Sequence, residues 1–172
     1  MATYVKIASN TVGSGGAASV TFSSIPSTYT DLVVKMSTRS SSGGSVAANT
    51  YIKFNGSSAS YSERLLYGNG TTPNSASQAT TQFNWAGQTT AGTATASTFN
   101  NSEVYIPNYT SANYKSISAD SVTENNATSA SIYIDAGLWS NTSAITSIAF
   151  TEQYGANFAQ YSTFTLYGIS NA

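Results

Sequence analysis

The chain contains neither cysteine nor histidine. Without cysteine it can form no disulfide, no thiolate metal site and no cysteine nucleophile. Without histidine it lacks the commonest general base, the commonest metal ligand and the side chain that most often changes charge near neutral pH. Because these absences remove most of the usual catalytic arrangements, we predict that the chain is not an enzyme and holds no metal and no cofactor.

Charged side chains are also scarce. They make up 8% of the 172 residues, whereas ordinary soluble domains contain about 25%. A net charge of -1 gives no attraction to nucleic acid or to an anionic membrane, and no apolar run approaches the roughly 18 residues that span a bilayer. We therefore predict neither a nucleic-acid nor a membrane partner. The surface must consist largely of Ser, Thr, Asn and Gln, which suits a protein that works inside an assembly.

The remaining candidates for chemistry are weak. A serine nucleophile could be activated by a lysine in place of histidine. The four lysines, however, lie on alternating, strand-like segments, where an outward solvated side chain is expected. Asp120 and Glu124 share one face of a strand but lie about 13 Å apart at a rise of about 3.3 Å per residue, whereas glycosidase carboxyl groups lie roughly 5 to 9.5 Å apart. With Asn125 they do not match the spacing of a cation-binding loop either. The sequence leaves open whether carboxylates from different strands meet.

Alternation of apolar and polar residues with a period of two dominates the chain, as is typical of strands that bury one face. Residues 64–67 are expected to form either a strand or a turn of helix, and residues 82–85 a short strand. Together with the clearer strands, about ten strands and little helix are expected. We predict one all-β domain over 1–172, an antiparallel β-sandwich of jelly-roll type. The clearer predicted strands are 4–8, 19–23, 31–36, 50–54, 103–106, 114–119, 131–135, 145–150 and 163–169.

Two connections need separate treatment. Residues 5–20 are interpreted as a first hairpin with a long loop. Residues 71–98 consist mostly of Thr, Ala, Ser, Gly and Gln, and they form either a long loop or two weak strands. We favour strands at the middle of this segment, because a structureless loop of that length is improbable in a compact domain.

Aromatic residues are plentiful, with twelve Tyr, seven Phe and two Trp. Interface cores are enriched in aromatic residues and depleted of charge. Tyr4, Tyr51, Tyr109 and Tyr133 face away from, or stand outside, the apolar alternation assigned to the core, so we predict them as interface residues. We expect Trp139 to anchor the core at the end of a strand.

Three segments, in this order, resemble a small β-rich structural domain of tailed-bacteriophage virions. They are residues 20–32, residues 137–139 followed by 142–148, and residues 157–169; residues 53–56, followed by Tyr61 and residues 66–70, match more weakly. Together they span most of the chain. The resemblance implies a structural role, either in capsid decoration or in a tail fibre, and implies no catalytic residues.

Two hypotheses follow. The first is a capsid decoration (cement) protein, which the short chain and the lack of any shaft-forming segment favour. Its partners would be the major capsid protein and further copies of itself, with a trimer as one arrangement. Since no signal-peptide pattern is present, we expect assembly in the host cytoplasm and location in the virion. The alternative is a tail-fibre or receptor-binding module that holds host glycan on exposed aromatic, Asn and Gln side chains.

Overall fold

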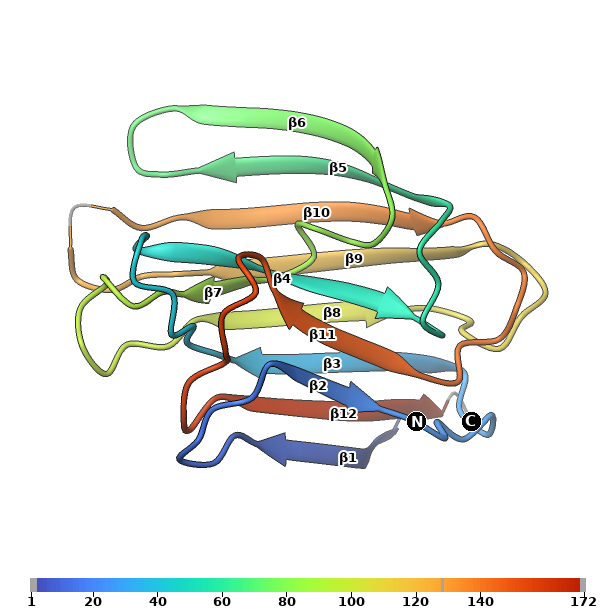
Figure 1. The fold of residues 1–172 in the computed structure, drawn as a ribbon. Helices are drawn as coiled ribbons and strands as arrows, with labels where there is room; N and C mark the ends of the chain where they lie inside the picture. The colour runs from blue at the N-terminus through green and yellow to red at the C-terminus, as the bar shows by residue number, and fades with distance from the viewer. Residues whose placement is uncertain (1–2, 128, 171–172) are drawn as a thin grey trace.

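The computed structural model describes residues 3–127 and 129–170. The described residues form twelve strands and no helix, arranged in two antiparallel sheets (Figure 1). The strands are β1 (Thr3–Thr11), β2 (Ser19–Phe22), β3 (Asp31–Ser37), β4 (Ala47–Phe54), β5 (Tyr61–Gly68), β6 (Pro73–Thr80), β7 (Gln88–Thr90), β8 (Asn101–Ile106), β9 (Lys115–Val122), β10 (Ile132–Trp139), β11 (Ile148–Glu152) and β12 (Thr163–Ser170).

Eight of these strands form a jelly roll. The chain pairs β1 with β12, β2 with β11, β3 with β8 and β4 with β7, so the pairs are nested from the chain ends inward. The pairs alternate between the sheets, which places β1-β12-β3-β8 in the large sheet and β2-β11-β4-β7 in the small one. Nested antiparallel pairs shared between two packed sheets are the topology of a jelly roll. The predicted fold class is therefore confirmed.

The other four strands extend the large sheet beyond β8. The hairpin β9-β10 is inserted between β8 and β11, and the hairpin β5-β6 is inserted between β4 and β7. They continue the sheet in the order β9-β10-β5-β6. We call these four strands the extension. The strands of the small sheet do not reach over β5 and β6 (Figure 1), so the inner face of the extension is covered differently from the rest of the sandwich.

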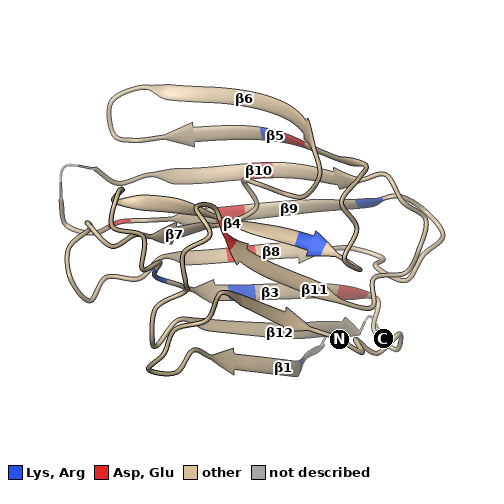
Figure 2. Ribbon diagram, in the orientation of Figure 1, with Lys and Arg blue, Asp and Glu red and all other residues tan. Residues whose placement is uncertain are grey.

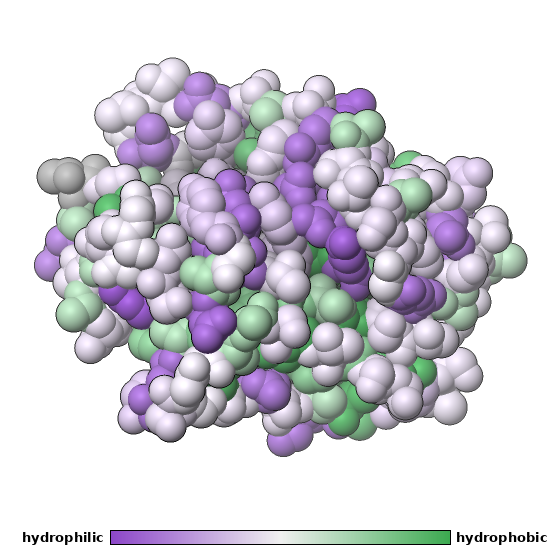
Figure 3. All heavy atoms as spheres, viewed as in Figure 1, coloured by the Kyte–Doolittle hydropathy of each residue, from purple (hydrophilic) through white to green (hydrophobic). Residues whose placement is uncertain are grey.

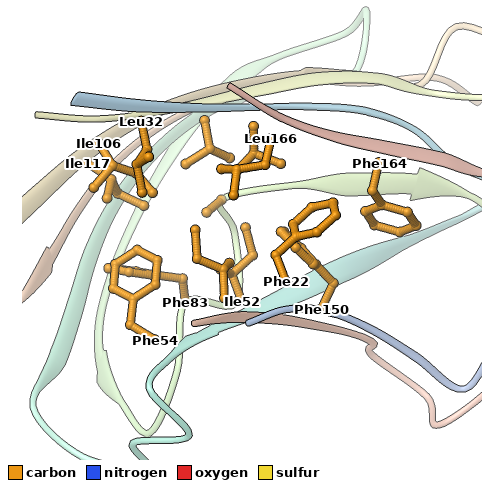
Figure 4. Packing of buried hydrophobic residues seen from close by; sticks show 14 of the residues in the cluster. Phe22, Leu32, Ile52, Phe54, Phe83, Ile106, Ile117, Phe150, Phe164 and Leu166 are labelled. Atoms are coloured by element: carbon orange, nitrogen blue, oxygen red, sulfur yellow. The ribbon is translucent and has the colours of Figure 1, made fainter. Parts of the chain in front are cut away.

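The hydrophobic core lies between the inner faces of the two sheets. Ile52 and Phe54 of β4 face apolar side chains of the large sheet such as Leu32 and Leu166 (Figure 4). Phe83 comes from the segment between β6 and β7, and its ring packs edge-on against Phe54 with centroids 5.3 Å apart. The segment that contains Phe83 thus closes the core at the side where the small sheet ends.

Trp139 confirms its predicted role. It is the last residue of β10, is buried, and its ring contacts those of Phe54 and Tyr61. Gly168 lies in β12 directly beneath the ring of Tyr29, where a Cβ atom would stand 2.3 Å from the ring. This close approach explains why a glycine interrupts an otherwise bulky strand.

The structure corrects several details. The predicted first hairpin is wrong, because β1 pairs with β12 and β2 pairs with β11, so the connection between them crosses from one sheet to the other. Residues 64–67 are part of a strand and not of a helix. The predicted strand 82–85 is reduced to one bridge between Phe83 and Ile52, while β6 and β7 lie on either side of it.

Little charge is visible on the fold (Figure 2). Among the described residues, Lys35 and Glu103 form the one ion pair, at 2.8 Å and exposed to solvent, where such a pair adds about 0–1 kcal/mol. The face shown in Figure 3 has mostly intermediate hydropathy, as expected for a surface of Ser and Thr. In the part of the chain that the structure describes, no helix is long and apolar enough to cross a membrane.

Candidate functional site

In the extension, aliphatic side chains face outward and polar side chains face inward, which is the reverse of the usual arrangement. On β10, Tyr133 and Asp135 point to the inner side with Gly137, whereas Ile132 and Ile134 point outward and are exposed. Neighbouring residues of β5 follow the same alternation, because the two strands are paired without a break. The inner face of the extension therefore carries polar and aromatic groups, and its outer face carries aliphatic ones.

A pair of carboxyl groups lies on the inner face. Glu63 and Asp135 come from β5 and β10, and each is 1% exposed. The register places Gly137 opposite Glu63, and Asp135 stands two residues away on the same face. Both side chains are thus diagonal neighbours across adjacent strands, within reach of each other.

The Glu63 carboxylate is well supplied with donors. It accepts hydrogen bonds from the backbone N–H groups of Asn84 (2.8 Å) and Trp85 (2.8 Å), and from the side-chain Nε2 of Gln78 (2.7 Å). Burial raises its pKa, and these hydrogen bonds oppose the rise. The segment between β6 and β7 is therefore held against the inner face of the extension by backbone hydrogen bonds to this carboxylate.

Asp135 has the opposite surroundings. Among the described residues, no donor reaches either of its carboxyl oxygens. Burial raises its pKa to about 8, and the nearby charge of Glu63 adds to the rise. At neutral pH Asp135 is therefore mostly protonated, because two charged carboxylates so close together and away from water would repel each other.

This pair answers the question that the sequence left open, because carboxylates from different strands do meet. Asp120 and Glu124, by contrast, are exposed and are not part of it. Neither Glu63 nor Asp135 lines the groove described next, so a substrate there has no direct path to their oxygens. Within the described residues, no group of three or more acidic side chains is placed to hold a metal ion.

A groove of about 350 Å³ lies between the extension and the start of β4. We call it the tyrosine groove, because Tyr67, Tyr133 and Tyr154 line it. The rings of Tyr67 and Tyr133 are 5.4 Å apart and tilted by 51°, so they form an angled wall. No charged side chain is among the lining residues. The other side chains that line it with polar groups are Ser45, Asn49, Asn69, Gln88, Ser129, Ser131 and Gln153.

Three of the side-chain amides that line the groove differ in the hydrogen bonds that they form. Gln88 is buried, and its Oε1 accepts a hydrogen bond from Ser131 Oγ at 2.9 Å. Gln153 Oε1 accepts from the backbone N–H of Asn49 at 3.0 Å, which fixes the Gln153 amide near the start of β4. Among the described residues, the Gln153 Nε2 and the whole side-chain amide of Asn49 have no hydrogen-bond partner. These groups are available to a ligand.

An aliphatic patch lies on the opposite face of the extension. Leu66, Ile132 and Ile134 are 52%, 51% and 55% exposed. Leu66 is paired directly with Ile134, and Ile132 follows on the same face. We call these three residues the outer patch. With Pro73 they border a shallow depression of about 190 Å³. Single exposed aliphatic residues are ordinary, whereas these three adjacent ones form a continuous apolar surface.

The four predicted interface tyrosines lie in different places. Tyr4 is exposed on the outer face of the large sheet, where the centroid of its ring lies 6.3 Å from that of the Tyr167 ring. Tyr51 is half-buried on β4, and Tyr133 lines the tyrosine groove. Tyr109 is fully buried and donates a hydrogen bond to the carbonyl of Pro26. The prediction that Tyr109 lies outside the core was therefore wrong, because its side chain is buried in the core just after the end of β8.

Sequence reasoning missed the outer patch and Tyr154. Alternation shows that Ile132 and Ile134 share a face, and apolar residues are assigned to the core by default. Tyr154 lies in the turn after β11, outside any alternating segment, so no pattern distinguishes it from other loop residues.

Comparison of the chain with protein-family models, with curated proteins and with solved structures gave no match. Because no relative suggests a function, a function can be inferred only from the sequence and the structure themselves. The outer patch, the tyrosine groove and the carboxyl pair are the features that we consider for this purpose.

Proposed function

We propose that this chain is a structural component of a tailed-phage virion, a decoration protein that docks on the capsid through the outer face of its large sheet. The observation that carries this proposal is the outer patch. The resemblance of residues 20–32, 137–148 and 157–169 to a phage structural domain supports the choice of particle. The proposed role is non-enzymatic, and the enclosure of Glu63 and Asp135 is in keeping with it.

The outer face carries aromatic and aliphatic groups, together with the charged side chains of Lys35, Glu103 and Asp120. Besides the outer patch it carries Tyr4 and Tyr167, which contact each other, and Tyr105, whose hydroxyl donates to Asp31 at 2.9 Å. Aromatic and aliphatic groups of this kind form the buried centre of interfaces. A stable interface buries about 800 Å² on each partner, and the face of an eight-stranded sheet offers room for such an area.

The free edge of the extension supports self-association. β6 pairs with β5 over eight unbroken residue pairs, and it contains no charged residue. The other edge strand, β1, contains Lys6 and a register shift between Lys6 and Ala8, which are ordinary means of blocking edge pairing. We infer that a second copy pairs along β6. A chain that stays monomeric in light scattering at high concentration contradicts this.

The decoration role is tested on particles assembled without this chain. We expect such particles to lose infectivity sooner on heating and on osmotic shock, and to regain resistance when purified protein is added. Resistance that is unchanged without the chain contradicts the proposal.

Ile134→Asp is expected to weaken binding to these particles at least tenfold. It places a charge at the centre of the outer patch, where docking would strip it of water. Since Ile134 is already exposed, the fold should be kept, which circular dichroism checks. Co-sedimentation with the particles measures binding. Thr21→Asp adds the same charge to an exposed position of β2 in the small sheet, away from the outer face of the large sheet, and it should bind normally. Equal binding by both variants would show that the patch is not the docking surface.

A further inference from the structure

We propose that the tyrosine groove binds a neutral carbohydrate. The proposal is independent of the decoration role, since the groove and the outer patch lie on opposite faces of β10: Tyr133 points to one side and Ile132 and Ile134 to the other. A chain docked through the outer patch would keep the groove open to solvent. The groove is therefore free to bind a ligand of its own.

The lining offers no charged side chain to pair with an ionic ligand. None of the residues that line the groove is charged. Glu152, the carboxylate beside it in sequence, accepts hydrogen bonds from the backbone N–H groups of Tyr154 (2.6 Å) and Ala156 (3.0 Å). Its Oε2 is thus engaged with its own turn, whereas its Oε1 is buried without a hydrogen-bond partner among the described residues. Burying an ionised ligand without a countercharge is costly, so the groove suits an uncharged one.

The tyrosine rings suit a ligand with apolar faces. Tyr67 and Tyr133 form the tilted wall, and Tyr154, at 58% exposure, stands at the rim. A sugar ring presents a face of C–H groups that packs against an aromatic ring, and its hydroxyl groups point out from the ring edge. Aromatic residues with a polar group at one end are suited to such surfaces.

The amides suit the hydroxyl groups. A hydroxyl both donates and accepts, and a side-chain amide offers both functions at fixed geometry. Asn49 presents a complete free amide, and Gln153 presents a free Nε2 while its Oε1 is held by the backbone. A purely apolar ligand would cover these groups without pairing them, at a cost of about 1–3 kcal/mol for each. Polar and apolar demands together point to carbohydrate.

A peptide fits less well. Peptides that lie along β-proteins usually add a strand to a free edge. β7 is the strand beside the groove, and its three residues are all buried, while Ser40 already donates to the Thr90 carbonyl at 2.7 Å. No edge is therefore free there. At about 350 Å³ the groove is near the lower end of known ligand sites, which are roughly 300–1,000 Å³, so it suits the end of a sugar chain.

The test uses the purified full chain and four neutral probes: maltotriose, cellotriose, mannotriose and the trimer of N-acetylglucosamine. Saturation-transfer NMR and calorimetric titration measure binding. We expect at least one probe to bind with a Kd on the order of 1 mM or tighter. A heparin oligosaccharide serves as the charged probe and should not bind. Binding of none of the neutral probes, or of the charged probe alone, overturns the proposal.

Two variants locate the site. Tyr154→Ala removes the exposed ring at the rim, and Asn49→Ala removes the free amide. Each is expected to weaken binding of the neutral probe at least tenfold. Tyr114→Ala and Tyr161→Ala are matched controls, because these tyrosines are equally exposed but lie outside the groove. Unchanged binding by both groove variants, or an equal loss in the controls, contradicts a site in the groove.

Discussion

Replacing Asp135 with asparagine is expected to stabilise the protein at alkaline pH and to flatten the pH dependence of its stability. The buried Asp135 has a pKa of about 8 in the folded chain, against an ordinary value of 3.8. Between these values the folded state holds a proton that the unfolded state has released. The free energy of unfolding therefore falls as the pH rises from about 4 to about 8, and this contribution levels off at higher pH.

The expected size of this effect is large. Each pKa unit corresponds to about 1.4 kcal/mol, so ionising Asp135 beside Glu63 costs several kcal/mol. The asparagine amide keeps a donor toward Glu63 and carries no titrating proton. At pH 5 the variant should differ little from the wild type, whereas at pH 9 it should be more stable by a few kcal/mol.

Urea unfolding at pH 5, 7 and 9 measures this difference. Ser118→Asn is the control, since Ser118 is exposed on β9 and its replacement adds the same amide without removing a carboxyl group, so the slope of stability against pH should be unchanged. The interpretation of the carboxyl pair is wrong if the wild type is equally stable at all three pH values, or if Asp135→Asn loses stability with pH as steeply as the wild type.

Replacing Gly168 with alanine is expected to destabilise the fold by about 1–3 kcal/mol, the usual cost of overpacking a core. The added Cβ atom would lie 2.3 to 2.6 Å from three atoms of the Tyr29 ring, so the ring or the strand must move. Thermal unfolding measures the change. Gly43→Ala serves as the control, because a Cβ atom there meets nothing within 4 Å.

A double variant separates a clash from a general weakening of β12. Tyr29→Ala removes the ring and costs stability by itself, because Tyr29 packs against the core. If the clash is the cause, adding Gly168→Ala to Tyr29→Ala should cost much less than it costs alone. Fully additive losses, or a Gly168→Ala variant as stable as Gly43→Ala, would contradict the close packing of Tyr29 on Gly168.

The sequence determined the fold class through simple periodicity. Segments such as β3, β8 and β12 contain enough apolar residues to identify them as strands without knowledge of their partners. β6 was not identified, because its sequence from Pro73 to Thr80 alternates only between small and polar residues. Its strand conformation comes from pairing with β5, and no local pattern reports such pairing.

The candidate site depended on register that the sequence does not contain. Glu63 and Asp135 belong to hairpins inserted at different points of the jelly roll, and only the pairing of β5 with β10 brings them together. The tyrosine groove similarly joins residues of the extension with Asn49 and with Tyr154 from the turn after β11. Long-range contacts of this kind are decided by packing.

By itself, the sequence determined an all-β chain without histidine or cysteine chemistry, since composition and period two suffice for that. It also determined that Ile132 and Ile134 share one face of β10, and Tyr133 and Asp135 the other. Only the tertiary structure decided which face is inside. The buried Trp139 and the close approach of Phe83 to Gly137 fix the inner side, because a bulky ring and a closely packed glycine can be accommodated only against the core. The aliphatic face is thereby left exposed.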